Sequence, residues 1–544
     1  MPARKAPARG KNMSFYFALQ YSAIQKAVLR HDRLWSMAGI SQTLLQLNEI
    51  DLPSLAKDHY GDVLVAGGGK FTASFSTKPQ AEKARQVIVK TIATTLPMLE
   101  FQYSEILEAE SLKDARQKNL VIGLAEQKRR FRGYGLTYNP HFKVCEECGE
   151  YPATEVRHRK KEKDHLCRFC FQAKGILPRL GTIQNIPVSE MTSIEKIYLK
   201  YLDLMEVSAE IRKTLRIPDD FERLFPHRQK AGETENGDDR RRMAVWLSDT
   251  NNMNTKVPTW LSQDDKEVPL IFHALTKAYV DIAAAALKTA FPQKSWNTHP
   301  EEGKFLPFRL IVAGGDDLCI VMAEEFVLDF AMALSKSYNE KIESFQEGDY
   351  LSMAWLEKHQ QKDRSVSPGP FSFGGAFVIT PIHTPFKLIH ELGETLMGKA
   401  KKTTDRQANS LDWRILSVEE KSVADEILAF EKPVFIHPPV SIPAAMSDTL
   451  NLQNYLELRI IYRDILSGSQ IKNIASALIK AKQDPIHLER LLVKVAYAGM
   501  EKGVKYLLAD CEFRKGRTPD GELTPGRIAT LLELLTIPDR RQSS

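Results

Sequence analysis

The chain has 544 residues, 43% of them hydrophobic and 26% charged, with 75 basic against 69 acidic side chains. That length predicts about three or four domains of an ordinary globular protein. The net charge of +6 is no nucleic-acid signature by itself. No apolar run reaches the roughly 18 residues of a membrane span, so we expect no membrane partner.

The chain begins with a basic tail, residues 1–12, that lacks the apolar core of a secretory signal. We interpret this tail as a disordered solvated arm, with phosphate contact as the alternative. Basic clusters at 126–132, 157–163 and 238–242 have the same two interpretations, a solvated face or a contact with nucleic-acid phosphate.

Residues 13–135 alternate between patterns typical of strands and of helices. An alternating aromatic run at 14–22 predicts a strand, and helical spacing of apolar residues follows it. A glycine-broken hairpin at 61–76 comes next, and helix, strand and helix follow. This alternation predicts a small α+β domain of the ferredoxin-like type.

Residues 136–225 contain two C-x-x-C pairs, which are separated by eighteen residues. Four thiolates at this spacing match tetrahedral Zn²⁺ in a closed structural site. A redox dithiol pair and an iron–sulfur cluster are the alternatives, and His165 is a nearby competing ligand. Cysteines used in this way suit a reducing cytoplasm, where we expect the protein to reside. The predicted zinc ligands are Cys145, Cys148, Cys167 and Cys170.

The pattern of the first block recurs at 243–420, after a polar stretch at 226–242 that we interpret as a linker or surface insertion. Both blocks carry VAGG in a hairpin that follows a long helix. Gly-Lys comes next in the first block and Asp-Asp in the second. This repeat predicts a duplicated fold with one active and one degenerate copy. Residues 440–544 are predicted to form an all-α C-terminal domain.

Three acidic residues of the second block are predicted to lie together. Asp249 ends a strand, and Asp316 and Asp317 follow Gly314-Gly315 in the hairpin. In a ferredoxin-like sheet these strands are neighbours, so the carboxylates can hold two divalent cations, and Mg²⁺ suits such ligands. The glycines would let the backbone approach a triphosphate. The alternatives are an ordinary tight turn at GGDD and an Asx turn at Asp249.

In the order of its motifs the chain resembles a known family, the large Palm-domain subunit of type III CRISPR effector complexes (the Csm/Cmr polymerase- and cyclase-like subunit). Four features carry the resemblance over roughly residues 13–540. They are AGGGKF in the first hairpin, the cysteine pairs between the blocks, GGDD in the second block, and the segment FSFGGAFVITPIHTPFKLIHELGETLMGKAKK…NSLDWRIL.

The resemblance implies an α+β architecture with a first Palm domain at 13–135, a zinc-ribbon-bearing domain at 136–225, a second Palm domain at 243–420 and a helical domain at 440–544. Both Palm domains would be ferredoxin-like and similar to nucleotidyl cyclases. The partners would be guide RNA, target RNA and the other type III subunits, namely a small helical subunit, a guide-end-binding subunit and backbone subunits.

The resemblance also implies an activity and its residues. When guide RNA pairs with a target transcript, the second Palm would join ATP through 3′–5′ linkages into cyclic oligoadenylates. Asp316 and Asp317 would hold Mg²⁺ or Mn²⁺, with Asp249 assisting. The remaining implied contacts are Gly314 and Gly315 with the triphosphate, Lys401 with phosphate, and Gly67, Gly68 and Gly69 with the second ATP.

Two features depart from the family pattern. Many members open with an HD nuclease domain, which we do not expect here, because His31-Asp32 lacks partner histidines at suitable spacing. No DNA cleavage is therefore predicted. Members often have a second acid two residues after the strand-end aspartate, where this chain has Asn251. A catalytically silent RNA-binding scaffold and a stand-alone Palm cyclase stay open as alternatives.

Overall fold

The computed structural model describes residues 13–22, 24–29, 33–96, 99–120, 143–149, 151–159, 162–173, 183, 185–225, 241–299, 303–314, 316–359, 369–416, 440–441 and 537. Several sequence predictions fall outside these residues. They concern the tail 1–12, most of the insertion 226–242, nearly all of the helical domain 440–544, the pair His31-Asp32, and Gly315.

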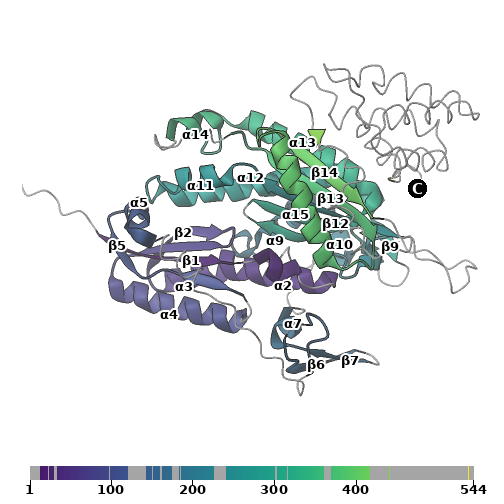
Figure 1. Cartoon of the computed structure of the whole chain (residues 1–544), viewed down its shortest axis with the longest axis horizontal. Coiled ribbons are helices and arrows are strands. Elements are labelled where there is room, and N and C mark those ends of the chain that lie inside the picture. The colour runs from purple at the N-terminus through teal and green to yellow at the C-terminus, as the bar shows by residue number, and fades with distance from the viewer. Residues whose placement is uncertain are drawn as a thin grey trace, which may run out of the picture.

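The first half of the chain forms one antiparallel sheet, with strand order β2-β3-β1-β4 and β5 also pairing with β1 (Figure 1). Side chains alternate across β1, so Phe17 and Leu19 pack on one face while Tyr16 and Ala18 pack on the other. The elements are β1 (Ser14–Tyr21), α1 (Ile24–Leu29), α2 (Leu34–Gln46), the π-helix η1 (Leu47–Asp51), α3 (Leu52–Asp58), β2 (Gly61–Gly67), β3 (Lys70–Phe75), α4 (Lys78–Thr95), β4 (Phe101–Tyr103), β5 (Leu107–Ala109), α5 (Leu112–Ala115) and a second π-helix, η2 (Arg116–Leu120).

The second half forms a mixed sheet of order β11-β12-β8-β13-β14-β15, in which only β13 and β14 pair in parallel among the described strands. Its elements are β8 (Arg242–Thr250), α11 (Met253–Trp260), α12 (Glu267–Ala290), η5 (Gln293–Ser295), β9 (Asn297–His299), β10 (Gly303–Phe305), β11 (Phe308–Gly314), β12 (Asp317–Ala323), η6 (Glu324–Phe326), α13 (Val327–Ser344), α14 (Met353–His359), β13 (Phe373–Pro381), α15 (Phe386–Thr403), β14 (Ser410–Ile415) and β15 (Val440–Ser441).

The two sheets repeat one topology. In each, the first strand lies between the second hairpin strand and the strand that follows the next long helix. Both hairpins also have a register shift at the same place, between Val63 and Val65 in one and between Leu310 and Val312 in the other. The duplication predicted from the two VAGG segments is therefore confirmed at the level of strand order, and the chain is a mixed α+β protein.

The segment between the halves contributes a small hairpin and a core helix. The helix α9 starts with a capping box, in which the side chains of Thr192 and Glu195 bond each other's backbone N–H groups. It packs on α12 and β11, as its apolar spacing predicts. The elements here are β6 (Glu155–Arg159), β7 (Glu162–Leu166), α7 (Arg168–Ala173), η3 (Val188–Glu190), α9 (Ser193–Leu204), α10 (Ala209–Thr214) and η4 (Phe221–Leu224).

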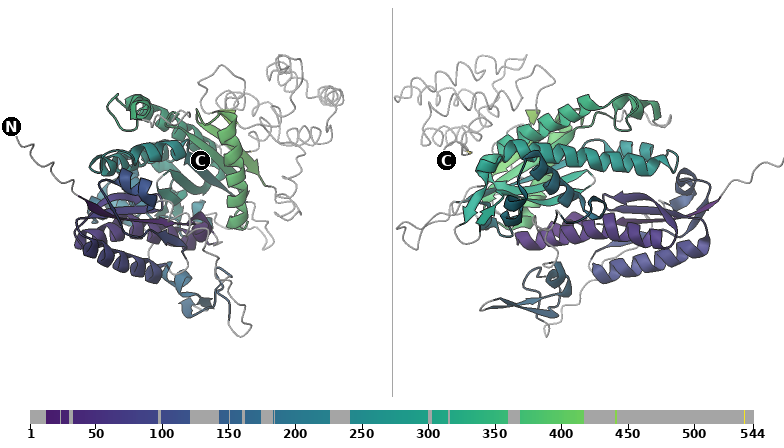
Figure 2. Two further views of the ribbon diagram at one scale, coloured as in Figure 1. Left: turned by 60° about the vertical axis from the view of Figure 1, so that its left-hand side comes forward. Right: turned by 180° about the vertical axis from the view of Figure 1, so that it is seen from behind.

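The halves pack against each other reciprocally. The helix α2 of the first half lies on β11, and α12 of the second half lies on β2, as the views in Figure 2 show. By length and composition α12 could also cross a membrane, but half of its apolar window is buried and it packs on α9 and α13. Its apolar character is therefore that of a core helix. This reciprocal packing brings the two glycine-rich hairpins to one place.

Candidate active site

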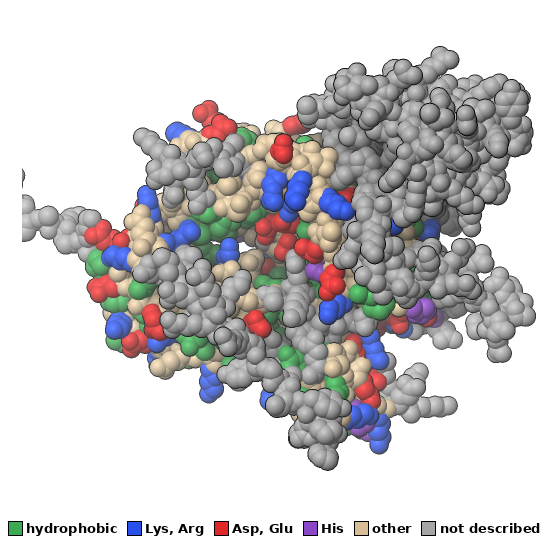
Figure 3. All heavy atoms as spheres, viewed as in Figure 1, with side chains coloured by type: hydrophobic (Ala, Val, Ile, Leu, Met, Phe, Trp, Pro, Cys, Tyr) green, Lys and Arg blue, Asp and Glu red, His purple; other side chains and the backbone are tan. Residues whose placement is uncertain are grey.

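A cavity of about 240 Å³ lies where the two hairpins approach each other. The first half contributes Gly67 and Gly68, and the second contributes Gly314, Asp316 and Asp317. Much of the remaining wall is apolar and comes from α11, α12 and α13. In Figure 3 a hollow opens between the halves, with acidic side chains along its edge. An apolar recess with polar groups at one end is the usual form of a small-molecule site.

The three acidic residues predicted to converge lie together. Asp317 begins β12 directly opposite Asp249 on β8, and the N–H of Thr250 donates to the carbonyl of Asp316 at 3.1 Å. One carboxylate oxygen from each aspartate lies within 4.8 Å of the others. Two oxygens on one Mg²⁺ are at most about 4.2 Å apart, since each Mg–O bond is about 2.1 Å. Small side-chain adjustments would let this cluster hold Mg²⁺ or Mn²⁺.

The negative charges of the three carboxylates repel one another, and this repulsion favours the binding of a cation. Burial and the neighbouring charge of Asp249 raise the pKa of Asp316 to about 6, although Lys70 opposes that rise. Burial, followed by the charges of Asp316 and Asp249, holds the pKa of Asp317 well above its ordinary value. Carboxylates that repel one another in this way gain stability from a divalent cation between them. The donor set and its charge therefore fit a metal site.

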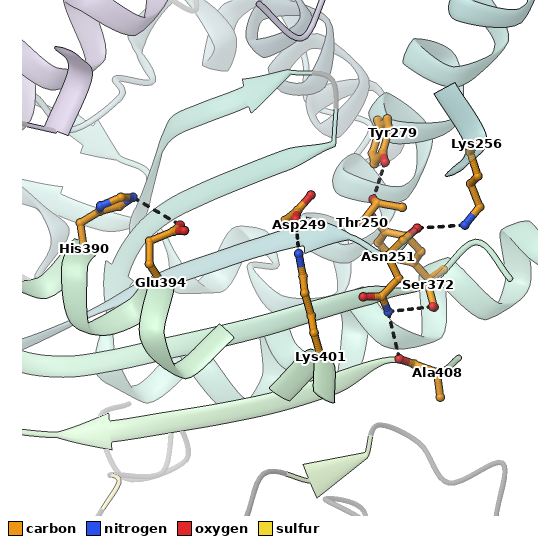
Figure 4. A network of polar contacts seen from close by, with 11 residues as sticks. Asp249, Thr250, Asn251, Lys256, Tyr279, Ser372, His390, Glu394, Lys401 and Ala408 are labelled. Atoms are coloured by element: carbon orange, nitrogen blue, oxygen red, sulfur yellow. Dashed lines mark hydrogen bonds and ion pairs between the residues drawn. The ribbon is translucent and has the colours of Figure 1, made fainter. Parts of the chain in front are cut away.

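Lys401 of α15 forms an ion pair with Asp249. Its ammonium, at the end of α15, donates to Asp249 Oδ2 (Figure 4). The stem of Lys401 crosses Gly374 of β13, where an added Cβ would lie 2.2 Å from Lys401 Cγ. Gly374 is the register partner of Asp249. The glycine in FSFGGAF thus leaves room for the lysine that the resemblance named as a phosphate contact.

Asn251 points away from the carboxylates. Its side-chain amide donates to Ser372 Oγ at 2.9 Å and to the carbonyl of Ala408 at 3.3 Å (Figure 4). Its own carbonyl accepts from Lys256 Nζ at 2.9 Å. Asn251 is fully buried, and it fixes the end of β8 to the segments before β13 and β14. The residue at the family's second acid position therefore has a structural role here.

The hairpin of the first half carries different groups at the equivalent positions. Lys70 pairs in register with Gln20 of β1, just as Asp317 pairs with Asp249. An ammonium and an amide thus replace two carboxylates, so this hairpin has no comparable cation ligands at those positions. Sequence reasoning noted Gly-Lys against Asp-Asp but did not assign Lys70 a role. Lys70 lines the cavity, whereas Gly69 (φ 71°) packs toward Ile24.

A partly buried glutamate, which sequence reasoning missed, lines the same cavity. Glu49 of η1 accepts from the N–H of Ser193 through Oε2 at 2.7 Å, and its Oε1 lies 3.0 Å from Ser193 Oγ. Ser193 Oγ also donates to the carbonyl of Ala313 at 2.5 Å. Nothing in the local pattern around Glu49 marks it, because its partners are distant in sequence.

Two tyrosines support the residue that follows Asp249. The hydroxyl of Tyr279 donates to Thr250 Oγ1, which also lies 3.1 Å from the hydroxyl of Tyr338. Burial raises the pKa of both tyrosines above their ordinary value. Both line the cavity as neutral hydrogen-bonding groups.

The four predicted zinc ligands also come together. The Sγ atoms of Cys145, Cys148, Cys167 and Cys170 all lie within 4.8 Å of one another, and those of Cys148 and Cys167 are 4.0 Å apart. Tetrahedral Zn²⁺ with bonds of about 2.3 Å places its sulfurs about 3.8 Å apart, so the geometry fits. Contacts with the other thiols raise the pKa of Cys170 and so oppose its ionisation. A bound cation would favour the thiolate instead.

Comparisons with known proteins found similarity only among solved structures, since no family model and no curated protein matches the chain. A Csm1–Csm4 cassette in complex with cA4 has 13% identity and a TM-score of 0.45, covering 97% of this chain and 70% of that chain. For the apo cassette the values are 13%, 0.47, 99% and 71%. For Csm1 in T.onnurineus they are 12%, 0.45, 97% and 70%.

Proposed function

We propose that this chain is the nucleotidyl-transferring large subunit of a type III CRISPR effector complex, and that it converts ATP into cyclic oligoadenylates when guide RNA pairs with target RNA. The observation that carries the proposal is the cluster of Asp249, Asp316 and Asp317 at the mouth of a cavity shared by both halves. Cation ligands beside glycine-rich turns suit a triphosphate substrate.

The reaction needs positioning and charge neutralisation more than acid–base groups. The 3′-hydroxyl oxygen of one ATP would bond to the α-phosphorus of the next, and pyrophosphate would leave. Asp316 and Asp317, with Asp249, would hold Mg²⁺ or Mn²⁺, which would neutralise phosphate charge and lower the pKa of the attacking hydroxyl. Gly314, with Gly315, would receive the triphosphate through its backbone. Lys401 orients Asp249 and would contact phosphate from there.

The first half would bind the second ATP. Gly67 and Gly68 face the cavity, and Gly69 completes their turn. Lys70 stands where the second half has Asp317, so an ammonium supplies the positive charge that cations supply in the second half. The halves would then act as two unlike Palm domains, one catalytic and one that presents the acceptor.

The remaining assignments follow from the same proposal. Residues 136–225 would hold structural Zn²⁺ in a zinc-ribbon module, and the cytoplasmic partners would be guide RNA, target RNA and other type III subunits. Solved structures show Csm1 in a cassette with Csm4, in complexes with one ATP and with cA4. Those ligands and that partner are the first to test with this chain.

The test is an ATP reaction resolved by mass, with the chain alone and with its guide-loaded partners, with and without target RNA. Cyclic adenylates that require target RNA and Mg²⁺ or Mn²⁺ are expected. Asp316→Asn/Asp317→Asn should lower the rate about 100-fold or more. Asp62→Asn, on the exposed side of β2, is the matched control.

Two other results would replace the proposal. Intact RNA binding without any nucleotide product would make the chain a scaffold. Product formed by the isolated chain without RNA would make it a stand-alone cyclase.

A further inference from the structure

Glu49 is partly buried at the wall of the cavity, and both of its carboxyl oxygens contact the same residue, Ser193. The N–H of Ser193 lies 2.7 Å from Oε2, and Ser193 Oγ lies 3.0 Å from Oε1. Ser193 is the first residue of α9, and its hydroxyl also lies 2.5 Å from the carbonyl oxygen of Ala313. These contacts join η1 of the first half, α9, and the hairpin that carries Asp316.

The protons in this series of hydrogen bonds, from Glu49 through Ser193 to Ala313, can be counted. A carbonyl oxygen only accepts, so the single hydroxyl proton of Ser193 must point to Ala313. Ser193 Oγ then has only lone pairs to offer Glu49, and an ionised carboxylate has no proton to give. The contact of 3.0 Å is a hydrogen bond only if Oε1 carries a proton. We propose that Glu49 is a neutral carboxylic acid that donates to Ser193 and thereby positions the GGDD hairpin.

The charges around Glu49 agree with this assignment. Burial raises the pKa of Glu49, and Glu195 on α9 adds to the rise. Lys196 on α9 and the hydrogen bond from the backbone N–H of Ser193 oppose it without reversing it. Across the cavity lie Lys70 and the acidic pair Asp316 and Asp317. A helix N-terminus usually favours an anion, but the contact at Oε1 requires the proton here.

Ionising Glu49 would therefore disturb the site in two ways. Ser193 could then donate to Glu49 or to Ala313 but not to both, so one oxygen pair would repel. A new negative charge would also stand beside the hairpin that the substrate's phosphates approach. Both contacts of Ser193 Oγ, with Glu49 and with the hairpin, are favourable only while Glu49 keeps its proton, which makes Glu49 a pH-sensitive positioning residue.

The first test concerns stability and does not depend on the proposed function. Glu49→Gln is permanently neutral, and its amide can donate to Ser193 Oγ as the acid does. Because folding raises the pKa of Glu49, its stabilising effect is complete below about pH 4.3 and is lost as pH rises through the folded value. The Tm of Glu49→Gln minus that of the natural chain should therefore widen by about 2 °C or more between about pH 4.3 and pH 8.

Two controls accompany this test. Glu82→Gln, on an exposed turn of α4, should show a Tm difference that does not change with pH. The infrared difference spectrum of the natural chain minus Glu49→Gln should contain the carbonyl band of a protonated carboxyl. A constant Tm gap for Glu49→Gln, or only carboxylate bands, would overturn the proposal.

The second test rests on the proposed function and uses the whole effector complex. In the pH profile of adenylate synthesis, Glu49→Gln should move the alkaline limb to higher pH. Ser193→Ala, which breaks the chain of hydrogen bonds, should lower the rate at every pH. An unmoved alkaline limb would overturn the positioning role even if the infrared band is present. If no variant of the complex makes product, the proposed function fails, and the stability test still decides the protonation of Glu49.

Discussion

At the scale of single residues, the candidate site depends on three partly buried carboxyl groups that lie close together. Asp316 and Asp317 are crowded against Asp249, and Lys401 neutralises only one of the three. Holding these carboxylates together in their ionised form therefore costs free energy unless a cation is bound. Such repulsion is expected in a site that binds cations.

The pH dependence of stability follows from these raised pKa values. A carboxyl whose folded pKa is raised stabilises the protein while protonated, and that contribution is lost as pH rises through the folded value. With metal chelated, the Tm should therefore fall as pH rises from about 3.9, the ordinary pKa of an aspartate, through about 6, the pKa of Asp316. Mg²⁺ should restore more Tm at pH 8 than at pH 5.

This dependence can be checked by thermal melts with and without Mg²⁺. Asp316→Asn/Asp317→Asn should flatten both the pH slope and the response to Mg²⁺. An equal Mg²⁺ response in the natural chain and in this variant would mean that the cation binds elsewhere.

At the scale of elements, Gly374 of β13 leaves the space through which Lys401 of α15 reaches Asp249. Gly374 lies beneath the stem of Lys401, and a methyl group there would displace that stem. Gly374→Ala should cost about 1–3 kcal/mol, the usual cost of overpacking, and should separate Lys401 from Asp249. Under the proposed function, adenylate synthesis should fall with it, because Lys401 would no longer hold Asp249.

Gly398→Ala is the matched control for that substitution. Gly398 lies in the same helix as Lys401, with open space around its Cα, so alanine there should stabilise by about 1 kcal/mol. Melting curves and rates of both variants give the comparison. Equal Tm values for the two would contradict the steric argument.

The cysteine module also contacts α2 and the residue before it, so its metal content should affect the stability of that helix. Glu147, inside the first C-x-x-C knuckle, accepts from Ser36 at 2.6 Å and pairs with Arg33 at 3.4 Å. Arg157 stacks over Trp35. Metal loss should therefore loosen α2, the helix that lies on β11, as well as the module (Figure 1).

Metal analysis of the purified chain should find one Zn²⁺ in this module. Cys148→Ser and Cys170→Ser should each lose that zinc and lower the Tm. Cys319→Ser, at a cysteine of β12 outside the module, should keep the zinc. Zinc retained after either module substitution, or bound iron in its place, would favour one of the alternatives to a zinc site.

At the scale of the whole molecule, the site exists only because the halves pack reciprocally. The cavity takes one wall from β2 and β3 of the first half and another from β11, α12 and α13 of the second. A ligand that fills it must contact both. ATP with Mg²⁺ should therefore slow hydrogen exchange in both hairpins, in peptides covering 66–71 and 312–318.

Mass-resolved exchange of the natural chain and of Lys70→Met separates the two contributions. Lys70→Met should lose protection at 66–71 and keep it at 312–318. Protection confined to the second hairpin in the natural chain would contradict a nucleotide site shared between the halves.

The sequence by itself determined the repeated β-α-β-β-α-β order and the local groups of the site. Alternating apolar residues encode strands, glycines encode the hairpin turns, and cysteine spacing encodes the metal knuckles, because each depends on neighbours in the chain. The convergence of Asp249 with Asp316 and Asp317 could also be expected, since strand order follows from that topology.

Only the tertiary structure decided which distant residues complete the site. Asn251 stands at a position where the family often has an acid, yet it turns into the interior toward Ser372. Nothing in the local sequence around Glu49 indicates its contact with Ser193, because only the packing of η1 against α9 brings the two residues together. Such roles depend on contacts between segments separated by more than a hundred residues, and no local propensity or spacing encodes them.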